Sequence, residues 1–508
     1  QSGDPDFPAV MLEKHTLPAI MQGRIASAQR WMNALPVETL LSHPRLCLDR
    51  AWALTFSSQT EAAIPFLERA EIMFADQSSA ALAVKSEALG LRSFGQTMYG
   101  NADEAIRLAQ LALDNSPQDL PFLRCANSLF LAGALSHAGR LDEALQVYHA
   151  VQPLCRKDDQ LAGLALLEAD FIHYVGMYLN ARGSGQQAKD LLTKSIHSFE
   201  LEAGGKYRPA ALYLYVGLGK ILFIENNLSQ AEHILEKGLQ LDPASMSVAA
   251  FDGWLTLWWV KTGQADYPAA RYIINHLEEI TQGRDQKVKR TVILTGALQD
   301  LLEGQVQKAA LGMQRLGLTG DTRQLLNKVS DSELMSWRSN EFLSYARLLA
   351  EQHKRADCLA IVDRMEGAAK AFQMNWILYR VWMVRAIALY QNGDLNGALE
   401  IAGRLLEQTS TMEANPARIF LIAGEPARLL LKEALRNGLH PQRVVRLLEE
   451  FPAEPPKDHS PTLPEALTER ELEVLGLMAA GLKNQQIADR LVISLNTIRY
   501  HTTNIFGK

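Results

Sequence analysis

One short pattern recurs along most of this chain and constrains its fold more than any other feature. Its clearest copy, residues 138–145, places a glycine and polar neighbours just before the small residue Ala144. Residues 99–106 and 392–399 have the same order, and looser copies begin at residues 22, 182, 226 and 303. The copies recur at intervals of roughly forty residues. Their small residues are Ala28, Ala63, Ala105, Ala144, Ala188, Ala231, Ala309 and Ala398, with degenerate copies near Ala269 and Ala360.

Each copy has the chemistry of a turn between two helices. Glycine ends the first helix in the left-handed conformation, and an adjacent Asp or Asn is expected to cap the second. Because one such pair cannot bury its apolar faces alone, successive pairs should stack into a superhelix. The pattern resembles the tetratricopeptide repeat, although its period exceeds the usual length of about 34 residues. We therefore predict a tetratricopeptide-like superhelix over residues 18–451, after a lead-in at residues 1–17; its role as a sensor is implied only by the family resemblance described below.

The last part of the chain has a different organisation. Residues 452–466 contain five prolines, which favour an extended, semi-rigid linker between two domains. Residues 467–508 then alternate short apolar-faced stretches with breaks, which predicts three short helices. Two short helices joined by a few residues form the unit that places a recognition helix in the major groove of DNA. The whole chain is thus predicted to be all-α, with a helical-repeat superhelix followed by a small helix-turn-helix domain.

Capping residues predict where these three helices begin and end. Thr468 and Glu471 have the spacing of a capping box, and Gly481 is expected to end the first helix. Asn484 is expected to cap the second helix and Ser494 the third.

The third helix has one apolar side and one polar side. Ile498, Thr502 and Ile505 share a side and should face the core, and no acidic residue follows Asp489. The polar side is either a solvated helix face or a surface with donors for bases and phosphates, and Arg499 is the best candidate for such a contact. His501 lies beside the core side, which favours a structural or phosphate role. The expected DNA-binding residues are Thr468, Arg470, Asn484, Gln485, Ser494, Asn496, Thr497, Arg499, Tyr500, His501 and Asn504.

The segment 467–508 resembles the DNA-binding domain of LuxR-type transcription regulators. Arg499 stands where the family usually has Lys, and Lys483 stands where it usually has Ser or a similar residue. The resemblance implies double-stranded DNA as a partner, homo-oligomers on DNA in the full-length protein, and a fourth helix that this sequence does not reach. The matching positions are Leu467, Thr468, Arg470, Glu471, Val474, Leu475, Ala480, Gly481, Leu482, Asn484, Ile487, Ala488, Leu491, Ser494, Thr497, Ile498, Arg499, His501, Asn504 and Ile505.

The repeats have a resemblance of their own. Residues 23–52 are similar to the start, and residues 424–430 to the end, of the sensor superhelix in MalT-like regulators. That resemblance implies an inducer bound by the superhelix and an ATP-binding switch domain earlier in the full protein. This chain has no GxxxxGK[ST] phosphate loop, since residues 217–220 lack its first glycine and its hydroxyl. We expect a segment truncated at both ends.

An aromatic cluster in the middle of the repeats is the candidate effector site. Trp254 and Trp258 lie one helical turn apart, and Tyr213 precedes them in the chain. These side chains belong either to the core between helices or to a pocket for a small-molecule or protein effector.

Charge and motif content restrict the remaining classes of function. With a net charge of −6, any contact with DNA has to be local. Four widely spaced cysteines, dispersed histidines and the absence of catalytic signatures predict no metal, no cofactor and no enzyme, and they suit the reducing cytoplasm. No apolar run is long enough to span a membrane. The main hypothesis is a sequence-specific transcription regulator that senses an effector; the alternative is a repeat scaffold for protein partners that does not bind DNA.

Overall fold

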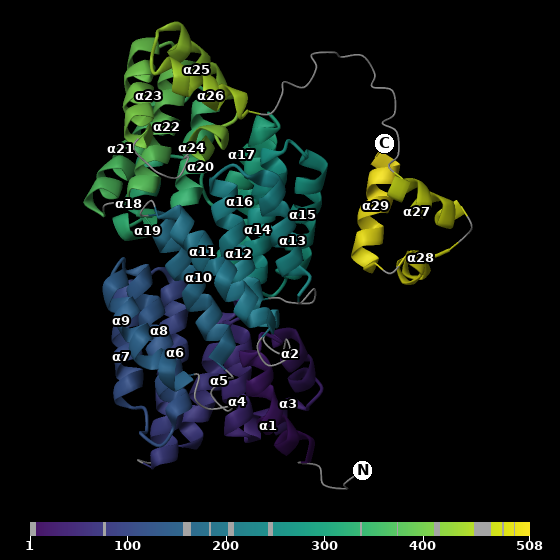
Figure 1. The fold of residues 1–508 in the computed structure, drawn as a ribbon. Helices are drawn as coiled ribbons and strands as arrows, with labels where there is room; N and C mark the ends of the chain where they lie inside the picture. Colours follow the sequence, from purple (N-terminus) through teal and green to yellow (C-terminus); the bar gives the residue numbers. More distant parts are fainter. Residues whose placement is uncertain are drawn as a thin grey trace. The chain divides into compact units, whose positions relative to one another are not determined.

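The computed structural model of the protein describes most of the chain as helices. It describes residues 7–74, 78–155, 164–181, 184–201, 208–241, 247–335, 338–372, 374–410, 417–451, 469–479, 482–491 and 493–507. Within these ranges there is no β-strand, which confirms the predicted all-α class (Figure 1). The chain divides into a repeat unit, Gln1–Phe451, and a C-terminal unit, Pro452–Lys508.

The repeat unit consists of consecutive helices, of which the α-helices range from 5 residues in α19 and α24 to 21 residues in α6. Its first half comprises α1 (Phe7–Met21), α2 (Ile25–Asn33), α3 (Val37–Ser42), α4 (Pro44–Thr55), α5 (Thr60–Met73), α6 (Ser79–Tyr99), α7 (Ala102–Asp114), α8 (Pro121–His137), α9 (Leu141–Cys155), α10 (Ala165–Ala181), α11 (Gly185–Leu201), η3 (Arg208–Ala211), α12 (Leu212–Ile224) and α13 (Leu228–Leu239). Its second half comprises α14 (Val248–Gly263), α15 (Tyr267–Ile280), α16 (Gln286–Leu302), α17 (Val306–Arg315), α18 (Thr322–Asn327), α19 (Asp331–Met335), α20 (Ser339–Glu351), α21 (Arg355–Ala371), α22 (Asn375–Gln391), α23 (Leu395–Ser410), α24 (Ala417–Leu421), α25 (Glu425–Arg436) and α26 (Pro441–Glu449).

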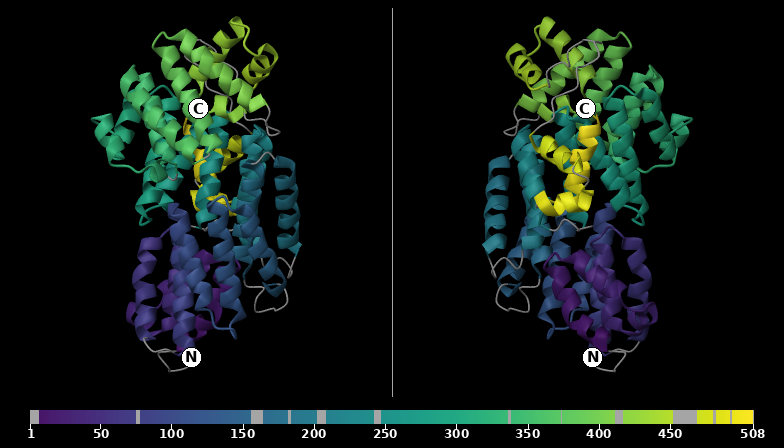
Figure 2. Two further views of the ribbon diagram at one scale, coloured as in Figure 1. Left: turned by 90° about the vertical axis from the view of Figure 1, so that its left-hand side faces the viewer. Right: turned by 90° about the vertical axis from the view of Figure 1, so that its right-hand side faces the viewer.

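These helices form stacked pairs, as the repeat pattern predicts. From α6 to α9 and again from α10 to α17, each helix packs on the next along the chain, as α6 does on α7 and α8 on α9. The first helices of neighbouring pairs also pack on one another, from α6 through α8, α10 and α12 to α14. Figure 2 shows this stack of pairs from two further sides. Most buried apolar residues of the repeats thus belong to one large core that runs through the stack, and Ala386, Ala398, Ala402 and Leu430 form a smaller cluster of their own.

The turns within the pairs have the left-handed backbone that the glycines suggested. Gly100, Gly139 and Gly393 have φ between 76° and 82°, and Ala265 takes the same position with φ 60°. The expected caps are present in part: the Asp394 carboxylate accepts the Gly397 N–H at 3.0 Å. At other turns the cap prediction was wrong. Asn101 accepts no helix N–H; its side-chain amide donates to the Gln96 side-chain oxygen at 2.7 Å.

The small residues of the pattern are buried where the two helices of a pair meet. Ala105, Ala144 and Ala231 each have no exposed surface. The small residue is the first in its helix whose backbone N–H donates to a carbonyl four positions earlier, as Ala144 does to Arg140. In the two degenerate copies the same buried position exists, but a residue other than the expected alanine occupies it. Ala270 and Cys358 take the buried position, whereas Ala269 is next to it and Ala360 is half-buried.

Successive turns of the superhelix touch at residues far apart in the chain. The Val248 N–H donates to the Phe56 carbonyl at 3.0 Å, and the Asp285 N–H donates to the Ser58 carbonyl at 3.2 Å. The Asp285 carboxylate accepts the Thr60 N–H at 2.8 Å, across a separation of 225 residues. The turn between α4 and α5 is therefore joined to the segments that precede α14 and α16.

Candidate nucleic-acid interface

The C-terminal unit contains three helices around a small apolar core. They are α27 (Glu469–Ala479), α28 (Asn484–Leu491) and α29 (Leu495–Gly507), and α29 packs on both others. Val474, Ile487, Ala488 and Ile498 are almost completely buried at the centre. Each helix contributes to this core, so that the core fixes the position of α29 on the other two helices.

Local hydrogen bonds set where α28 and α29 begin. The Ser494 hydroxyl accepts the Thr497 N–H at 3.0 Å, so the predicted cap of the third helix is confirmed. The predicted cap of the second helix was wrong by one residue. Asn484 is the first residue of α28, and the Lys483 carbonyl accepts the Ile487 N–H. Gln486, three residues after Lys483, reaches back and accepts the Lys483 N–H at 2.9 Å, as the second half of a capping box does.

The two sides of α29 differ in the way the sequence predicts. Ile498 and Thr502 are buried against the other helices, and the Thr502 hydroxyl donates to the Arg499 carbonyl at 2.8 Å. Arg499 is exposed, and Thr497 and Tyr500 are half-buried beside it. The outward side of α29 thus presents a guanidinium, a hydroxyl and a phenol, which are groups that donate to phosphates and base edges.

His501 and Arg470 lie at the margin of this outward side. Burial and the nearby charge of Arg470 lower the pKa of His501, although Glu471 opposes the shift. His501 therefore adds a neutral donor or acceptor at neutral pH. Arg470 forms an ion pair with Glu473 at 2.5 Å and donates to the Leu491 carbonyl at 3.3 Å. That second bond ties α27 to the last residue of α28, which gives Arg470 a bracing role.

The remaining expected contacts divide into exposed residues and residues that the structure does not describe. Gln485 and Ser494 are exposed, and Asn484 is half-buried at the start of α28. Thr468, Gly481 and the linker at residues 452–466 lie outside the described residues, as do the side chains of Asn496, Asn504 and Ile505. Lys483 and Arg490, two exposed cations on the same unit, were not among the expected DNA contacts, although their charge was an available signal.

The expected effector residues occupy separate places in the repeat unit. Trp258 is 1% exposed and donates from its indole nitrogen to Gln299 on α16 at 2.9 Å. Trp254, on the same helix α14, is half-buried against His276, with ring centroids 4.6 Å apart. Tyr213 is buried on α12, and its carbonyl is 2.9 Å from the His173 ring. The structure therefore places Trp258 and Tyr213 within the core between helices.

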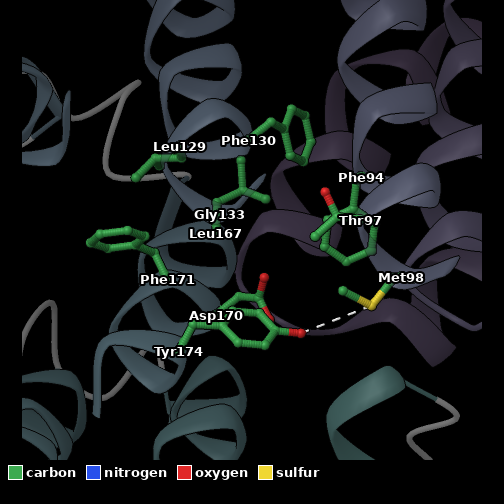
Figure 3. Close-up of a pocket in the computed structure, with 10 residues that line it drawn as sticks. All are labelled: Phe94, Thr97, Met98, Leu129, Phe130, Gly133, Leu167, Asp170, Phe171 and Tyr174. Carbon is green, nitrogen blue, oxygen red and sulfur yellow. Dashed lines mark hydrogen bonds between the residues drawn. The ribbon is translucent and has the colours of Figure 1, made fainter. Parts of the chain in front are cut away.

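A small cavity lies among α6, α8 and α10. Figure 3 shows its lining, in which Asp170 lies beside the Tyr174 ring and the rings of Phe94, Phe130 and Phe171 also contribute to the wall. The cavity volume of about 10 Å³ suits a single water molecule. Gly133 faces the space, since a Cβ there would have no atom within 4 Å. This interior is too small for an organic effector, but it leaves a carboxyl group in apolar surroundings.

A superhelix of helix pairs joined in one chain to a helix-turn-helix unit defines a class of regulatory DNA-binding proteins. The comparisons with known proteins agree with this class. The sequence model of the MalT-like TPR region matches residues 86–437. The model of the bacterial regulatory proteins of the luxR family matches residues 465–508. The chain therefore belongs to the MalT-like TPR family and carries a luxR-family domain at its C-terminal end.

Solved structures resemble the repeat unit at low identity. A Rap protein complexed with competence and sporulation factor is 14% identical, with a TM-score of 0.47, over 73% of this chain and 100% of that chain. The human IFIT1 dimer with PPP-AAAA is 13% identical, with a TM-score of 0.40, over 80% of this chain and 95% of that chain. At these TM-scores neither likeness carries an argument about function.

Two other kinds of site are absent from the described residues. No group of three or more His, Cys, Asp and Glu side chains is arranged there to hold a metal ion. No helix in the described ranges combines the length and the apolar content needed to cross a membrane. The matched domains are regulatory and not catalytic.

Proposed function

We propose that this transcription regulator binds specific duplex DNA sequences by placing α29 in the major groove. The observation that carries the proposal is the two-sided structure of α29. Ser494 fixes its first turn, Ile498 anchors its inner side, and Arg499 is exposed on its outer side. A helix held in this way presents its first two turns to base edges, which is how helix-turn-helix domains bind DNA.

Further contacts from the same unit would hold the phosphates. The start of α28 carries Asn484 and the exposed Gln485, and helix N-termini favour anions. Lys483 and Arg490 add positive charge near it. These contacts would orient the protein on DNA, whereas Arg499 and Thr497 would distinguish the bases. An effector bound by the repeat unit would then control DNA binding by the C-terminal unit, in the cytoplasm of a bacterium.

A substitution at Arg499 tests this proposal. Duplexes are first selected from a random pool by the full chain, and their affinities are measured by fluorescence anisotropy over a series of salt concentrations. Arg499→Ala should weaken binding by about 1–3 kcal/mol if the guanidinium contacts a base. If it contacts a phosphate instead, the salt slope should fall by about one.

The matched control is Arg404→Ala, which removes an exposed arginine of the repeat unit. Its affinity and salt slope should equal those of the unaltered protein. Equal affinity and equal slope for Arg499→Ala would refute the placement of α29 in the groove. Failure of the unaltered protein to retain any duplex, together with a stable complex with a protein partner, would favour the scaffold alternative.

A further inference from the structure

A second cavity lies where two segments of the repeat unit meet. Helices α14 and α16 form one side of it, and α20, α22 and α24 form the other. Its volume is about 50 Å³, which is room for about four water-sized groups. The lining residues that matter for its chemistry are Trp259, Leu343, Arg347, Arg380, Met383 and Val384.

Two guanidinium groups line this cavity without a carboxylate partner. Arg347 is 7% exposed; it donates to the Ile422 carbonyl at 3.1 Å, and its Nε has no acceptor. Arg380 is half-buried and donates to the Asn340 side chain at 2.7 Å. Among the described residues neither arginine forms an ion pair. Glu351, which favours the charge on Arg347, accepts a hydrogen bond from Gln391.

A buried positive charge at Arg347 and a half-buried one at Arg380, both at one cavity and without a carboxylate partner, are unfavourable. Removing a charged group from water is costly unless an opposite charge and further hydrogen bonds compensate. Burial accordingly lowers the pKa of Arg347 to about 10, which still leaves it charged at neutral pH. An anion in the cavity would supply the missing charge. The planar guanidinium suits carboxylate and phosphate oxygens because it can donate two parallel hydrogen bonds.

The rest of the lining indicates what kind of molecule would carry that anion. Trp259 and Leu298 lie on one side of the cavity, and Leu343, Met383 and Val384 lie on the other. These side chains offer an apolar surface and one aromatic ring, and the few polar groups gather at the arginines. A cavity of this composition orients a ligand by its charged end and holds its body by apolar contact.

We propose that this cavity binds a small organic anion, a carboxylate or a phosphate ester with an apolar body, as the effector of the protein. The proposal rests on the proposed function, in which an effector acts on the repeat unit. It places the effector beside Trp259, the neighbour of Trp258 on α14.

The location of the cavity gives the anion a means of control. Arg418 on α24 already ties one side of the cavity to the turn after α12, since it donates to Asn226 and lies 4.8 Å from the ring centre of Phe223. Asn226 in turn donates to Glu450 at 2.9 Å. An anion held by Arg347 and Arg380 against Trp259 would add a link between α14 on one side of the cavity and α20 and α22 on the other. It would therefore favour one packing of the repeats over others.

Direct binding measurements on the full chain test the proposal without DNA. Isothermal calorimetry would compare acetate and methyl phosphate, which are small enough for the cavity and differ in the anion, with acetamide, which has the size of acetate and no charge. We expect at least one anion to bind and acetamide to bind at least tenfold more weakly. The preferred anion distinguishes a carboxylate effector from a phosphate ester. Equal binding of acetamide, or no binding of either anion, would overturn the proposal whatever the outcome of the DNA experiment.

Variants locate the bound anion. Arg380→Gln, at a half-buried position, should lower the affinity for the anion at least tenfold, and Arg380→Lys should retain part of it because the charge remains. Arg404→Gln, on the surface of α23, should bind as the unaltered protein does. Circular dichroism would establish that all three are folded. Unchanged affinity in folded Arg380→Gln would show that any binding occurs at another site and would overturn the proposal.

Discussion

Asp170 is a carboxyl group that the fold buries without compensation. It lies on α10 at the small cavity drawn in Figure 3, and among the described residues no group donates a hydrogen bond to it. Burial raises the pKa of Asp170 to about 8. The side chain is therefore largely protonated at neutral pH. Its ionisation makes the free energy of unfolding depend on pH.

The sign of that dependence follows from proton linkage. The folded state holds the Asp170 proton up to a pH of about 8, whereas the unfolded chain releases it near its ordinary pKa of about 4. The stabilisation is complete below pH of about 4 and is lost as the pH rises through about 8. The largest slope is about 1.4 kcal/mol per pH unit. Asp170→Asn should remove this slope, so that the variant melts higher than the unaltered protein at pH 8.5 and close to it at pH 5.

Thermal melts at several pH values, followed by circular dichroism, measure this effect. Asp142→Asn, at an exposed position on α9, is the matched control and should keep the pH profile of the unaltered protein. If Asp170→Asn and the unaltered protein lose stability in parallel between pH 5 and 8.5, Asp170 is not the group responsible.

Single residues show where sequence reasoning succeeds and where it stops. The cap at Ser494 and the buried side of Ile498 depend on contacts within one helix or its neighbours, and both were predicted. The start of α28 was misplaced because Gln486, two residues beyond the expected cap, satisfies the Lys483 N–H. The burial of Asp170 and Arg347 could not be predicted, since their neighbours come from helices that follow or precede them by many residues.

At the scale of the helix pair, the turn is the element that repeats. Its left-handed residue is glycine in several pairs, but Ala265, Ser58 and His353 have the same conformation at equivalent turns. The pattern was predictable because backbone sterics alone require it. The residues that replace the usual ones in this pattern were not predictable. Cys358, for example, takes the buried position of the small residue, and the two helices still pack as a pair.

This difference between turns predicts opposite effects of opposite substitutions. Gly139→Ala places a side chain at φ 76° where nothing else obstructs it, so the change should destabilise the protein by about 1–2 kcal/mol through backbone strain alone. Ala265→Gly removes the same strain from an exposed turn. Because glycine also adds entropy to the unfolded chain, the expected gain is only about 0.5–1 kcal/mol.

Native-state hydrogen exchange measures both effects locally, which suits a repeat array whose unfolding need not be all-or-none. Exchange should accelerate in α8 and α9 for Gly139→Ala and should slow in α14 and α15 for Ala265→Gly. Effects of the same sign at the two turns would contradict a common backbone origin.

At the scale of the repeat unit, contacts between successive turns decide its geometry. Asp285 precedes α16 yet does not cap it. Its carboxylate instead accepts the Thr60 N–H at 2.8 Å and the Tyr99 hydroxyl at 3.2 Å. Arg284 next to it donates to the Ser57 carbonyl. No periodicity in the sequence indicates these partners, because each lies more than 180 residues away and depends on the accumulated twist of all the repeats between them.

The last prediction concerns this junction. Asp285→Ala removes the acceptor for the Thr60 N–H and the Tyr99 hydroxyl. It removes no cap from α16, because the Asp285 side chain does not cap that helix, so the helix pairs themselves should remain intact. Hydrogen exchange should therefore accelerate at residues 57–60 and 98–100 and stay unchanged within α16. Asp321→Ala is the matched control, because Asp321 accepts the Arg323 N–H at the start of its own helix α18 and should affect that helix alone. Acceleration spread evenly over the repeat unit would mean that Asp285 supports the fold as a whole and that the turns are not joined through it.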